Sequence, residues 1–130
     1  MAIDYRNDPF PAAEQLAALS ASAWGSPAES EFSPKLALSL AHVGAYDGET
    51  LVGFVNVAWD GGGHAFILDT MVDRQWQRQG IATRLVQQAT RLARERGAVW
   101  LHVDFEPHLT GFYRRCGFVP TEAGLIKLRG

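Results

Sequence analysis

The chain has little cysteine and no long hydrophobic run. Its single cysteine, Cys116, excludes an intrachain disulfide and favours a reducing compartment. No apolar stretch approaches the roughly 20 residues that a membrane-spanning helix needs. The N-terminus also lacks the basic segment and apolar run of a secretion signal. These absences predict a cytoplasmic protein that makes no membrane contact.

Internal repeats, low-complexity tracts and domain-sized linkers are also missing. The 130 residues are 47% hydrophobic and 20% charged. Such a length and balance are typical of one globular domain with a single core. We therefore expect one domain that spans residues 1–130.

Basic residues are scarce in the first half of the chain, and acidic residues are scarce in the second half. Residues 1–73 hold ten acidic and two basic side chains, whereas residues 74–130 hold four acidic and ten basic ones. The two halves could meet different partners, an anion at the C-terminal half and a cation at the other, or they could be ordinary solvated faces. A net charge of −2 and the lack of an interleaved aromatic platform argue against nucleic-acid binding.

The first part of the chain predicts a helix followed by a hairpin. Residues 11–22 have apolar residues at helical spacing behind Pro11, and residues 24–34, rich in Gly, Ser and Pro, predict a mobile loop. Residues 35–43 predict a short helix that runs into a strand. Two apolar runs around Asp47-Gly48 predict a hairpin over 43–59, with a turn at 60–63 and a strand at 64–72.

The second part alternates strands and helices. An amphipathic helix opens at Gly80 and ends at Gly97; it is followed by a strand at 98–105 and a short helix at 107–116. Residues 118–128 predict a closing strand pair. Hairpins followed by strand–helix–strand predict an α/β fold, a mixed and mostly antiparallel twisted sheet flanked by helices.

The stretch "QRQGIATRLV", residues 77–86, opens its helix without the Ser, Thr, Asp or Asn that normally caps a helix N-terminus. Free N–H groups and the helix dipole favour a phosphate there. Gly80 lets a ligand approach the backbone, Thr83 adds a hydroxyl donor, and Arg78 adds positive charge. Neither the dinucleotide fingerprint nor the P-loop pattern is present. The stretch therefore predicts an anion site of another kind.

Two motifs here resemble those of the GNAT superfamily of N-acetyltransferases. Gln77-x-x-Gly80-x-Ala82 fits its Q/R-x-x-G-x-G/A motif, placed after a strand and at the start of an amphipathic helix. "GFYRRCGF", residues 111–118, resembles its second landmark, an aromatic-Tyr-x-x-x-Gly-Phe run. The order of the expected elements matches as well, so the resemblance covers essentially the whole chain.

The resemblance implies a GNAT-like fold that uses acetyl-CoA as co-substrate, with the pyrophosphate on the N–H groups of residues 78–83. The pantetheine arm is expected to pair with the backbone near Val72, and the acetyl group to lie between the ends of strands 64–72 and 98–105. Many members have an Asn where this chain has Glu106, so Glu106 inherits no coenzyme contact. The implied coenzyme-binding residues are Met71, Val72, Gln77, Arg78, Gln79, Gly80, Ile81, Ala82, Thr83 and Tyr113.

The implied reaction is the direct attack of a primary amine, of a small molecule or a protein, on the thioester. Tyr113 is the expected general acid toward the departing sulfur, although its aromatic neighbours also suit a packing role. Asp69 is the candidate base, or it binds a cationic acceptor, or it forms an ordinary ion pair. A non-catalytic acyl-CoA-binding or sensing module is the alternative function.

His102 and Asp104 belong to the run "HVDFEPH", which contains several residue types that can ligate a metal. No cysteine joins it and it crosses a strand–helix break, so we predict no metal. A polar wall of the acceptor pocket or a satisfied half-buried pair are the interpretations left open. Trp24, Trp59, Trp76 and His64 are further candidates for the acceptor entrance. The assembly is expected to be a monomer or a homodimer.

Overall fold

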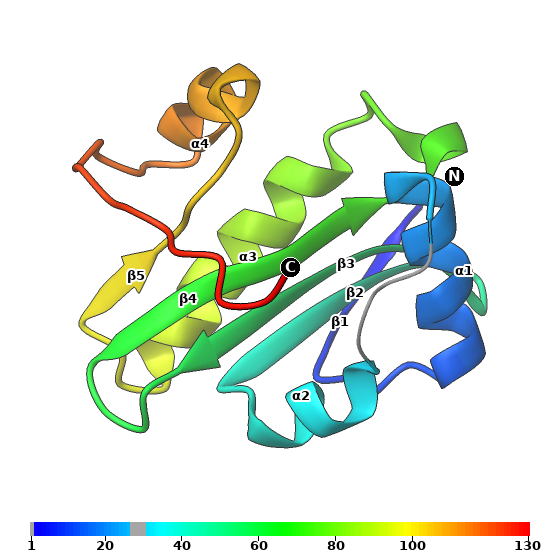
Figure 1. Cartoon of the computed structure of the whole chain (residues 1–130). Helices are drawn as coiled ribbons and strands as arrows, with labels where there is room; N and C mark the ends of the chain where they lie inside the picture. Colours follow the sequence, from blue (N-terminus) through cyan, green and yellow to red (C-terminus); the bar gives the residue numbers. More distant parts are fainter. Residues whose placement is uncertain (1, 27–30) are drawn as a thin grey trace.

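A five-stranded sheet organises the molecule (Figure 1). The computed structural model describes residues 2–26 and 31–130. The strands follow one another in the sheet in chain order: β1 (Asp4–Asn7), β2 (Ala41–Asp47), β3 (Thr50–Trp59), β4 (His64–Val72) and β5 (Trp100–His102). The first three pairings are antiparallel and the last, β4 with β5, is parallel. The predicted mixed, mostly antiparallel sheet is confirmed.

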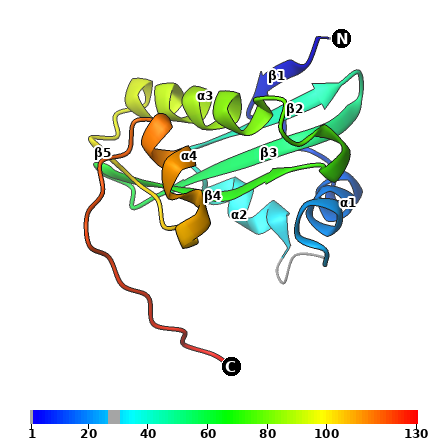
Figure 2. The same ribbon diagram turned by 90° about the horizontal axis from the view of Figure 1, so that it is seen from above.

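Helices cover both faces of this sheet (Figure 2). α3 (Ile81–Glu95) lies on one face, and α1 (Ala13–Trp24) and α2 (Phe32–Leu38) lie on the other. Two short 3₁₀ helices, η1 (Arg74–Trp76) and η2 (Pro107–Leu109), precede α3 and α4 (Thr110–Arg115). None of the helices in the described part of the chain is long and apolar enough to cross a membrane.

Each face of the sheet has its own hydrophobic core. On the α3 side, one apolar stripe of the helix packs on β2, β3 and β4. On the other side, Leu16 and Leu19 of α1 and Phe32 and Leu36 of α2 pack against Phe54 and Met71. Because both faces are covered, β2 and β3 are buried along nearly their whole length.

Gly53 on β3 lets the start of α3 approach the sheet closely. A methyl group at this position would lie 3.0 Å from both Ile81 Cγ2 and Leu85 Cδ1, tighter than ordinary van der Waals contact. In the register of the sheet, Gly53 is opposite Val72, the last residue of β4. The close approach therefore sets the N-terminus of α3 beside the end of β4.

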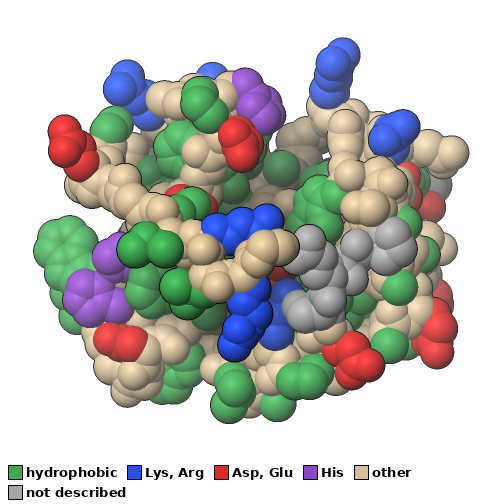
Figure 3. Space-filling model, in the orientation of Figure 1, with side chains coloured by type: hydrophobic (Ala, Val, Ile, Leu, Met, Phe, Trp, Pro, Cys, Tyr) green, Lys and Arg blue, Asp and Glu red, His purple; other side chains and the backbone are tan. Residues whose placement is uncertain are grey.

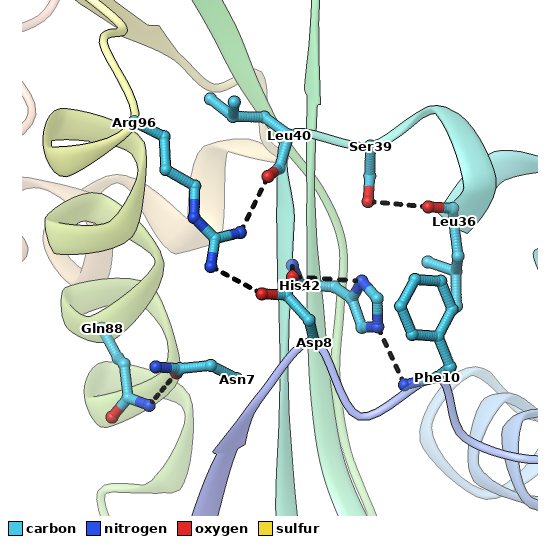
Figure 4. A network of polar contacts seen from close by, with 9 residues as sticks. All are labelled: Asn7, Asp8, Phe10, Leu36, Ser39, Leu40, His42, Gln88 and Arg96. Atoms are coloured by element: carbon cyan, nitrogen blue, oxygen red, sulfur yellow. Dashed lines mark hydrogen bonds and ion pairs between the residues drawn. The ribbon is translucent and has the colours of Figure 1, made fainter.

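A polar network ties the beginning of the chain to the far end of α3 (Figure 4). The Arg96 guanidinium donates to Asp8 Oδ2 at 2.6 Å and to the Leu40 carbonyl at 2.9 Å. The second Asp8 oxygen accepts the His42 backbone N–H at 3.0 Å, and His42 Nε2 accepts the N–H of Phe10. β1 is thereby held to the sheet by side chains as well as by strand pairing.

Several predicted elements need correction. The closing strand pair at 118–128 is wrong: residues 119–130 are exposed and have no helix or strand. The strand predicted at 98–105 keeps only Trp100–His102, and β1 was not predicted at all. α2 begins at Phe32 rather than at residue 35, inside the predicted loop, and residues 27–30 of that loop lie outside the described residues.

Candidate functional site

The loop between β4 and α3 is held in place by two side-chain contacts. Asp73 accepts the backbone N–H of Gln75 at 2.9 Å and caps η1. The Gln77 amide donates to the carbonyl of Val72 at 3.2 Å and draws the loop back onto the end of the strand. Arg78 and Gly80 then adopt left-handed backbone conformations, with φ of 64° and 84°. These two turns direct the chain into α3.

The N-terminus of α3 presents unpaired backbone donors. Its first bond joins the Arg84 N–H to the Gly80 carbonyl at 3.1 Å, and no side chain caps the helix. The N–H groups of residues 78–83 make no hydrogen bond to any residue that the structure describes. Together with the positive end of the helix dipole, such a row of donors suits an anion such as phosphate.

The residues expected to bind the coenzyme divide into two groups here. Gln77, Arg78, Gln79 and Gly80 are exposed on the loop, with Ala82 and Thr83 half-buried behind them. The Met71 and Ile81 side chains are buried in separate cores, so these two residues offer only their backbone groups. Coenzyme binding by this set stays a prediction.

β4 and β5 separate soon after they meet. They pair only over His64–Phe66 and Trp100–His102, at the start of β4. From residue 67 to residue 72, β4 keeps its partner β3 on one edge, and no described strand pairs with its other edge. This open edge points its backbone groups at the space where the resemblance places the pantetheine arm.

Beside the open edge lies a hollow of about 670 Å³. Three acidic side chains, Asp69, Asp104 and Glu106, reach its wall, and no Lys or Arg does among the described residues. The hollow is lined by Trp24, Ile67, Leu68, Asp69, Thr70, Val103, Asp104, Phe105, Glu106, Leu109, Tyr113, Thr121, Ala123, Gly124 and Leu125. Its chemistry therefore favours a ligand with positive charge.

Tyr113 lines the hollow from α4 and is held by aromatic contacts. Its ring stacks on Phe105 with centroids 4.7 Å apart, and Phe112 and Phe118 meet it edge-on. Burial raises the pKa of its phenol above the usual value, and the Thr70 hydroxyl, which is otherwise buried without a partner in the described chain, counteracts this slightly. Burial thus favours the neutral form of the phenol.

Asp69 lies on β4 where the strand bulges. The register with β3 shifts between Phe54 and Asn56, and Asp69 itself has a φ of 56°. Its carboxylate is only 16% exposed and is paired with Lys35 of α2, whose Nζ lies 3.3 and 3.4 Å from the two oxygens. The Lys35 ammonium also lies over the ring of Phe32, 4.3 Å from its centroid. Asp69 therefore already holds an ammonium group in this structure.

Lys35 and Thr70 were missed by sequence reasoning. Lys35 follows a predicted loop and carries no motif; only the packing of α2 on the sheet brings it to Asp69. Among the four candidates for the acceptor entrance, Trp24 lines the hollow, whereas Trp59, Trp76 and His64 do not.

The run "HVDFEPH" divides between the interpretations left open above. Asp104 and Glu106 line the hollow. His102 instead lies 2.7 Å from His64, nitrogen to nitrogen, and stacks on Phe66. No group of three or more His, Cys, Asp or Glu side chains in the described residues is arranged to hold a metal ion.

Comparison with known families gives one match over most of the chain. Residues 4–118 match the model of a family described as the acetyltransferase (GNAT) family. Among curated proteins, glucosamine 6-phosphate N-acetyltransferase 1 of Oryza sativa subsp. japonica is 39% identical over 51 residues. That alignment covers 39% of this chain and 31% of the rice protein, about a third of its length.

Two solved structures resemble the whole molecule. A probable acetyltransferase of unknown function from meticillin-resistant Staphylococcus aureus has a TM-score of 0.84 and 25% identity, with 99% of this chain and 100% of that chain covered. A GNAT family acetyltransferase from Streptococcus pneumoniae has a TM-score of 0.81, also at 25% identity, with 98% and 100% covered. Both chains have nearly the same length as this one.

Proposed function

The chain belongs to the GNAT family of acetyltransferases and is an N-acetyltransferase. From this we propose that it transfers the acetyl group of acetyl-CoA to a cationic primary amine. The observation that carries the proposal is the row of free N–H groups at residues 78–83, next to the open edge of β4. With its pyrophosphate on these N–H groups and its pantetheine arm along the open edge of β4, acetyl-CoA would deliver its thioester to the hollow beside Tyr113.

The coenzyme residues of the proposal are those on the loop. The backbone N–H groups of residues 78–83 donate hydrogen bonds to the pyrophosphate, and Arg78, which is exposed beside them, adds positive charge. The Gln77 amide stabilises the loop by donating to the Val72 carbonyl. The N–H groups of residues 78–83 are therefore not needed to hold the loop and stay free for the ligand. Met71 and Val72 supply backbone at the end of the open edge.

The proposed chemistry is a direct transfer. The deprotonated amine attacks the thioester carbon, a C–N bond forms, and the C–S bond breaks. Asp69 receives the proton that the ammonium group loses before the attack, directly or through water. The Tyr113 phenol donates a proton to the departing thiolate and regains one from the nitrogen of the tetrahedral intermediate. Both side chains line the same hollow, as this division of roles requires. Alignment of the two substrates supplies much of the rate.

The acceptor is inferred from the charge of the hollow. Asp69, Asp104 and Glu106 surround it, and Asp69 already pairs with the Lys35 ammonium. A polyamine or an aminoglycoside-like amine carries the positive charge that this wall attracts, whereas a sugar phosphate brings negative charge to it. We therefore infer an acceptor unlike the amino-sugar phosphate named for the rice relative.

The test is release of CoA thiol from acetyl-CoA across a panel of amines, with the acetylated product identified by mass. Spermidine and an aminoglycoside are expected to be turned over faster than glucosamine 6-phosphate, and a lysine peptide measures protein amines. Turnover of glucosamine 6-phosphate alone contradicts the charge argument. Saturable CoA binding with no turnover of any amine contradicts the enzyme and favours the acyl-CoA-binding module.

A further inference from the structure

Lys35 places an amine of the chain itself at the wall of the hollow. Its Nζ lies 3.4 and 3.3 Å from the two carboxylate oxygens of Asp69, which lines that hollow. Among the described residues, Lys35 is the only basic side chain that forms an ion pair with Asp69. The chain therefore supplies its own ammonium group at the carboxylate that would take the proton of an acceptor amine.

The packing of α2 on the sheet fixes where this ammonium group lies. Phe32 and Leu36 are buried and anchor the helix in the core on that face of the sheet. Lys35 follows Phe32 by three positions, so both side chains lie on the same face of the helix, with the ammonium over the ring. The Lys35 side chain is nevertheless 33% exposed. Its backbone is thus fixed, while its long side chain keeps room to move at the charged end.

We propose that Lys35 is an acetylation site of this protein, and that the protein acetylates it itself from acetyl-CoA bound in the same molecule. The inference rests on the proposed function, which brings the thioester to this hollow and gives Asp69 and Tyr113 their roles. The Lys35 amine lies where an external acceptor amine has to lie in order to pass its proton to Asp69. Because it is held there by the fold, it needs no binding step of its own.

The reaction is the same transfer with an internal nucleophile. The Lys35 ammonium loses one proton to Asp69, and the neutral Nζ attacks the thioester carbon with its lone pair. The C–N bond forms and the C–S bond breaks, with the bonding electrons leaving on the sulfur. The Tyr113 phenol donates a proton to the departing thiolate and regains one from the nitrogen of the tetrahedral intermediate. The products are N-acetyl-Lys35 and the CoA thiol, and Asp69 returns its proton to water.

Acetylation of Lys35 changes the charge of the acceptor side. The amide carries no charge, so the ion pair with Asp69 is lost. Asp69, together with Asp104 and Glu106, then faces the hollow without Lys35 to neutralise it. An external cationic amine no longer has to displace the Lys35 ammonium. The acetylated protein should therefore bind such an acceptor more tightly than the unmodified protein does.

The second lysine of the sequence is an internal reference for this reaction. Lysine occurs at only two positions, Lys35 and Lys127. Lys127 is exposed on the C-terminal segment, residues 119–130, which crosses the front of the molecule in Figure 1. Figure 3 shows basic side chains near the middle of that face, with hydrophobic side chains around them. A reaction that follows exposure alone labels Lys127 first, whereas the proposed reaction labels Lys35.

The first test is peptide mass mapping of the full chain after incubation with deuterium-labelled acetyl-CoA. Acetyl groups acquired during expression are removed beforehand with a lysine deacetylase. Lys35 is expected to gain the label at least about tenfold faster than Lys127, at a rate that does not change when the protein is diluted. Asp69→Asn and Tyr113→Phe are each expected to slow labelling of Lys35 at least about tenfold. Equal labelling of the two lysines, or a Lys35 rate that falls on dilution, overturns the proposal.

The second test separates this inference from the proposed function. Thiol release with spermidine is measured before and after incubation with acetyl-CoA, for the wild type and for Lys35→Arg, which keeps the charge and takes up no acetyl group. KM for spermidine is expected to fall about two- to fivefold in the wild type and to stay constant in Lys35→Arg. Turnover of spermidine without label on Lys35 overturns this inference and leaves the proposed function standing. No turnover of any amine and no label on Lys35 overturns both.

Discussion

The proposed coenzyme side of the site is built from backbone groups, whereas the proposed acceptor side is built from side chains. The proposed coenzyme side is one continuous loop, residues 72–83, in which the backbone N–H groups of residues 78–83 make no hydrogen bond to a described residue. The acceptor side is a set of side chains that α1, β4, the stretch after β5 and α4 bring together, with Lys35 of α2 behind Asp69. Backbone recognises a group that every family member shares, whereas side chains can differ for each acceptor. Substitutions on the two sides should therefore affect CoA binding and acceptor turnover separately.

Gly80→Glu should break the coenzyme side alone. The residue has a φ of 84°, which a side chain adopts only with strain, and its Cβ position points into open space rather than into protein. A carboxylate there meets the pyrophosphate directly, so CoA affinity should fall at least about 100-fold. Isothermal titration calorimetry measures it. Gly80→Ala is the matched control: it carries the strain without the charge and should lose about tenfold. Unchanged CoA affinity in the Glu variant would contradict the loop assignment.

Tyr113→Phe should damage the chemistry and spare both binding sites. The ring keeps its stacking on Phe105 but loses the phenol, whose pKa burial holds above its usual value. We expect kcat to fall at least about tenfold with CoA affinity unchanged. Steady-state thiol release and CoA titration measure the two quantities. Phe112→Leu, which removes only an edge-on contact, serves as control. A kcat equal to that of the wild type would remove Tyr113 from the mechanism.

Lys35→Met should strengthen binding of the acceptor without changing CoA affinity. The Lys35 ammonium occupies Asp69, and a cationic acceptor has to displace it. Partly exposed ion pairs contribute little, so KM for spermidine is expected to fall only about two- to fivefold, with CoA affinity unchanged. Arg91→Met, at an exposed position of α3 outside the lining of the hollow, is the control with no expected effect on KM. A raised KM would instead show that Lys35 positions Asp69 for the acceptor.

Asp8→Asn should lower the free energy of unfolding without affecting CoA binding or acceptor turnover. Asp8 accepts hydrogen bonds from the Arg96 guanidinium and the His42 backbone, so the variant should unfold about 2 kcal/mol more easily in urea at neutral pH. Asp4→Asn, in an exposed pair with Arg6, should cost less than about 1 kcal/mol. Activity per folded molecule should stay unchanged in both. A loss of kcat in Asp8→Asn would show that the two regions are coupled.

The same network sets the response of the protein to acid. Burial lowers the pKa of His42 below 6.5, so the unfolded chain takes up a proton that the folded one refuses, and stability falls as the pH drops below 6.5. Burial alone would raise the pKa of Asp8, but Arg96 and the His42 N–H hold it below 3.8, so its contribution is lost at still lower pH. Urea midpoints of the wild type should therefore decline from pH 6.5 downward.

Sequence reasoning could propose a coenzyme side because the signal for it is local. The pattern from Gln77 to Ala82 is contiguous, the missing cap is visible in the letters, and the stripe of α3 follows from its spacing. The acceptor side has no such signal. Lys35 meets Asp69 across 34 positions, and the bulge that turns Asp69 toward the hollow depends on register with β3. Such contacts follow from packing rather than from local pattern.

The errors in secondary structure have physical causes too. Leu101 and Val103 favour a strand through residue 105, yet β5 stops at His102 because its neighbour β4 diverges. Residues 118–128 have strand propensity, but propensity alone does not form a strand, and in the structure these residues pair with none of the described strands. β1 went unpredicted because four residues ending in Asn7 carry little periodicity, and pairing with β2 decides their state.

The network around Asp8 has a consequence for the order of folding during synthesis. Asp8 and Arg96 are 88 positions apart, so the N-terminal strand emerges from the ribosome long before its guanidinium partner. Closing so long a loop carries an entropic cost that only a formed sheet and a docked α3 can offset. β1 is therefore synthesised first but is fixed to the sheet late, after Arg96 is available. Ribosome-bound chains shorter than this should leave β1 open to proteolysis.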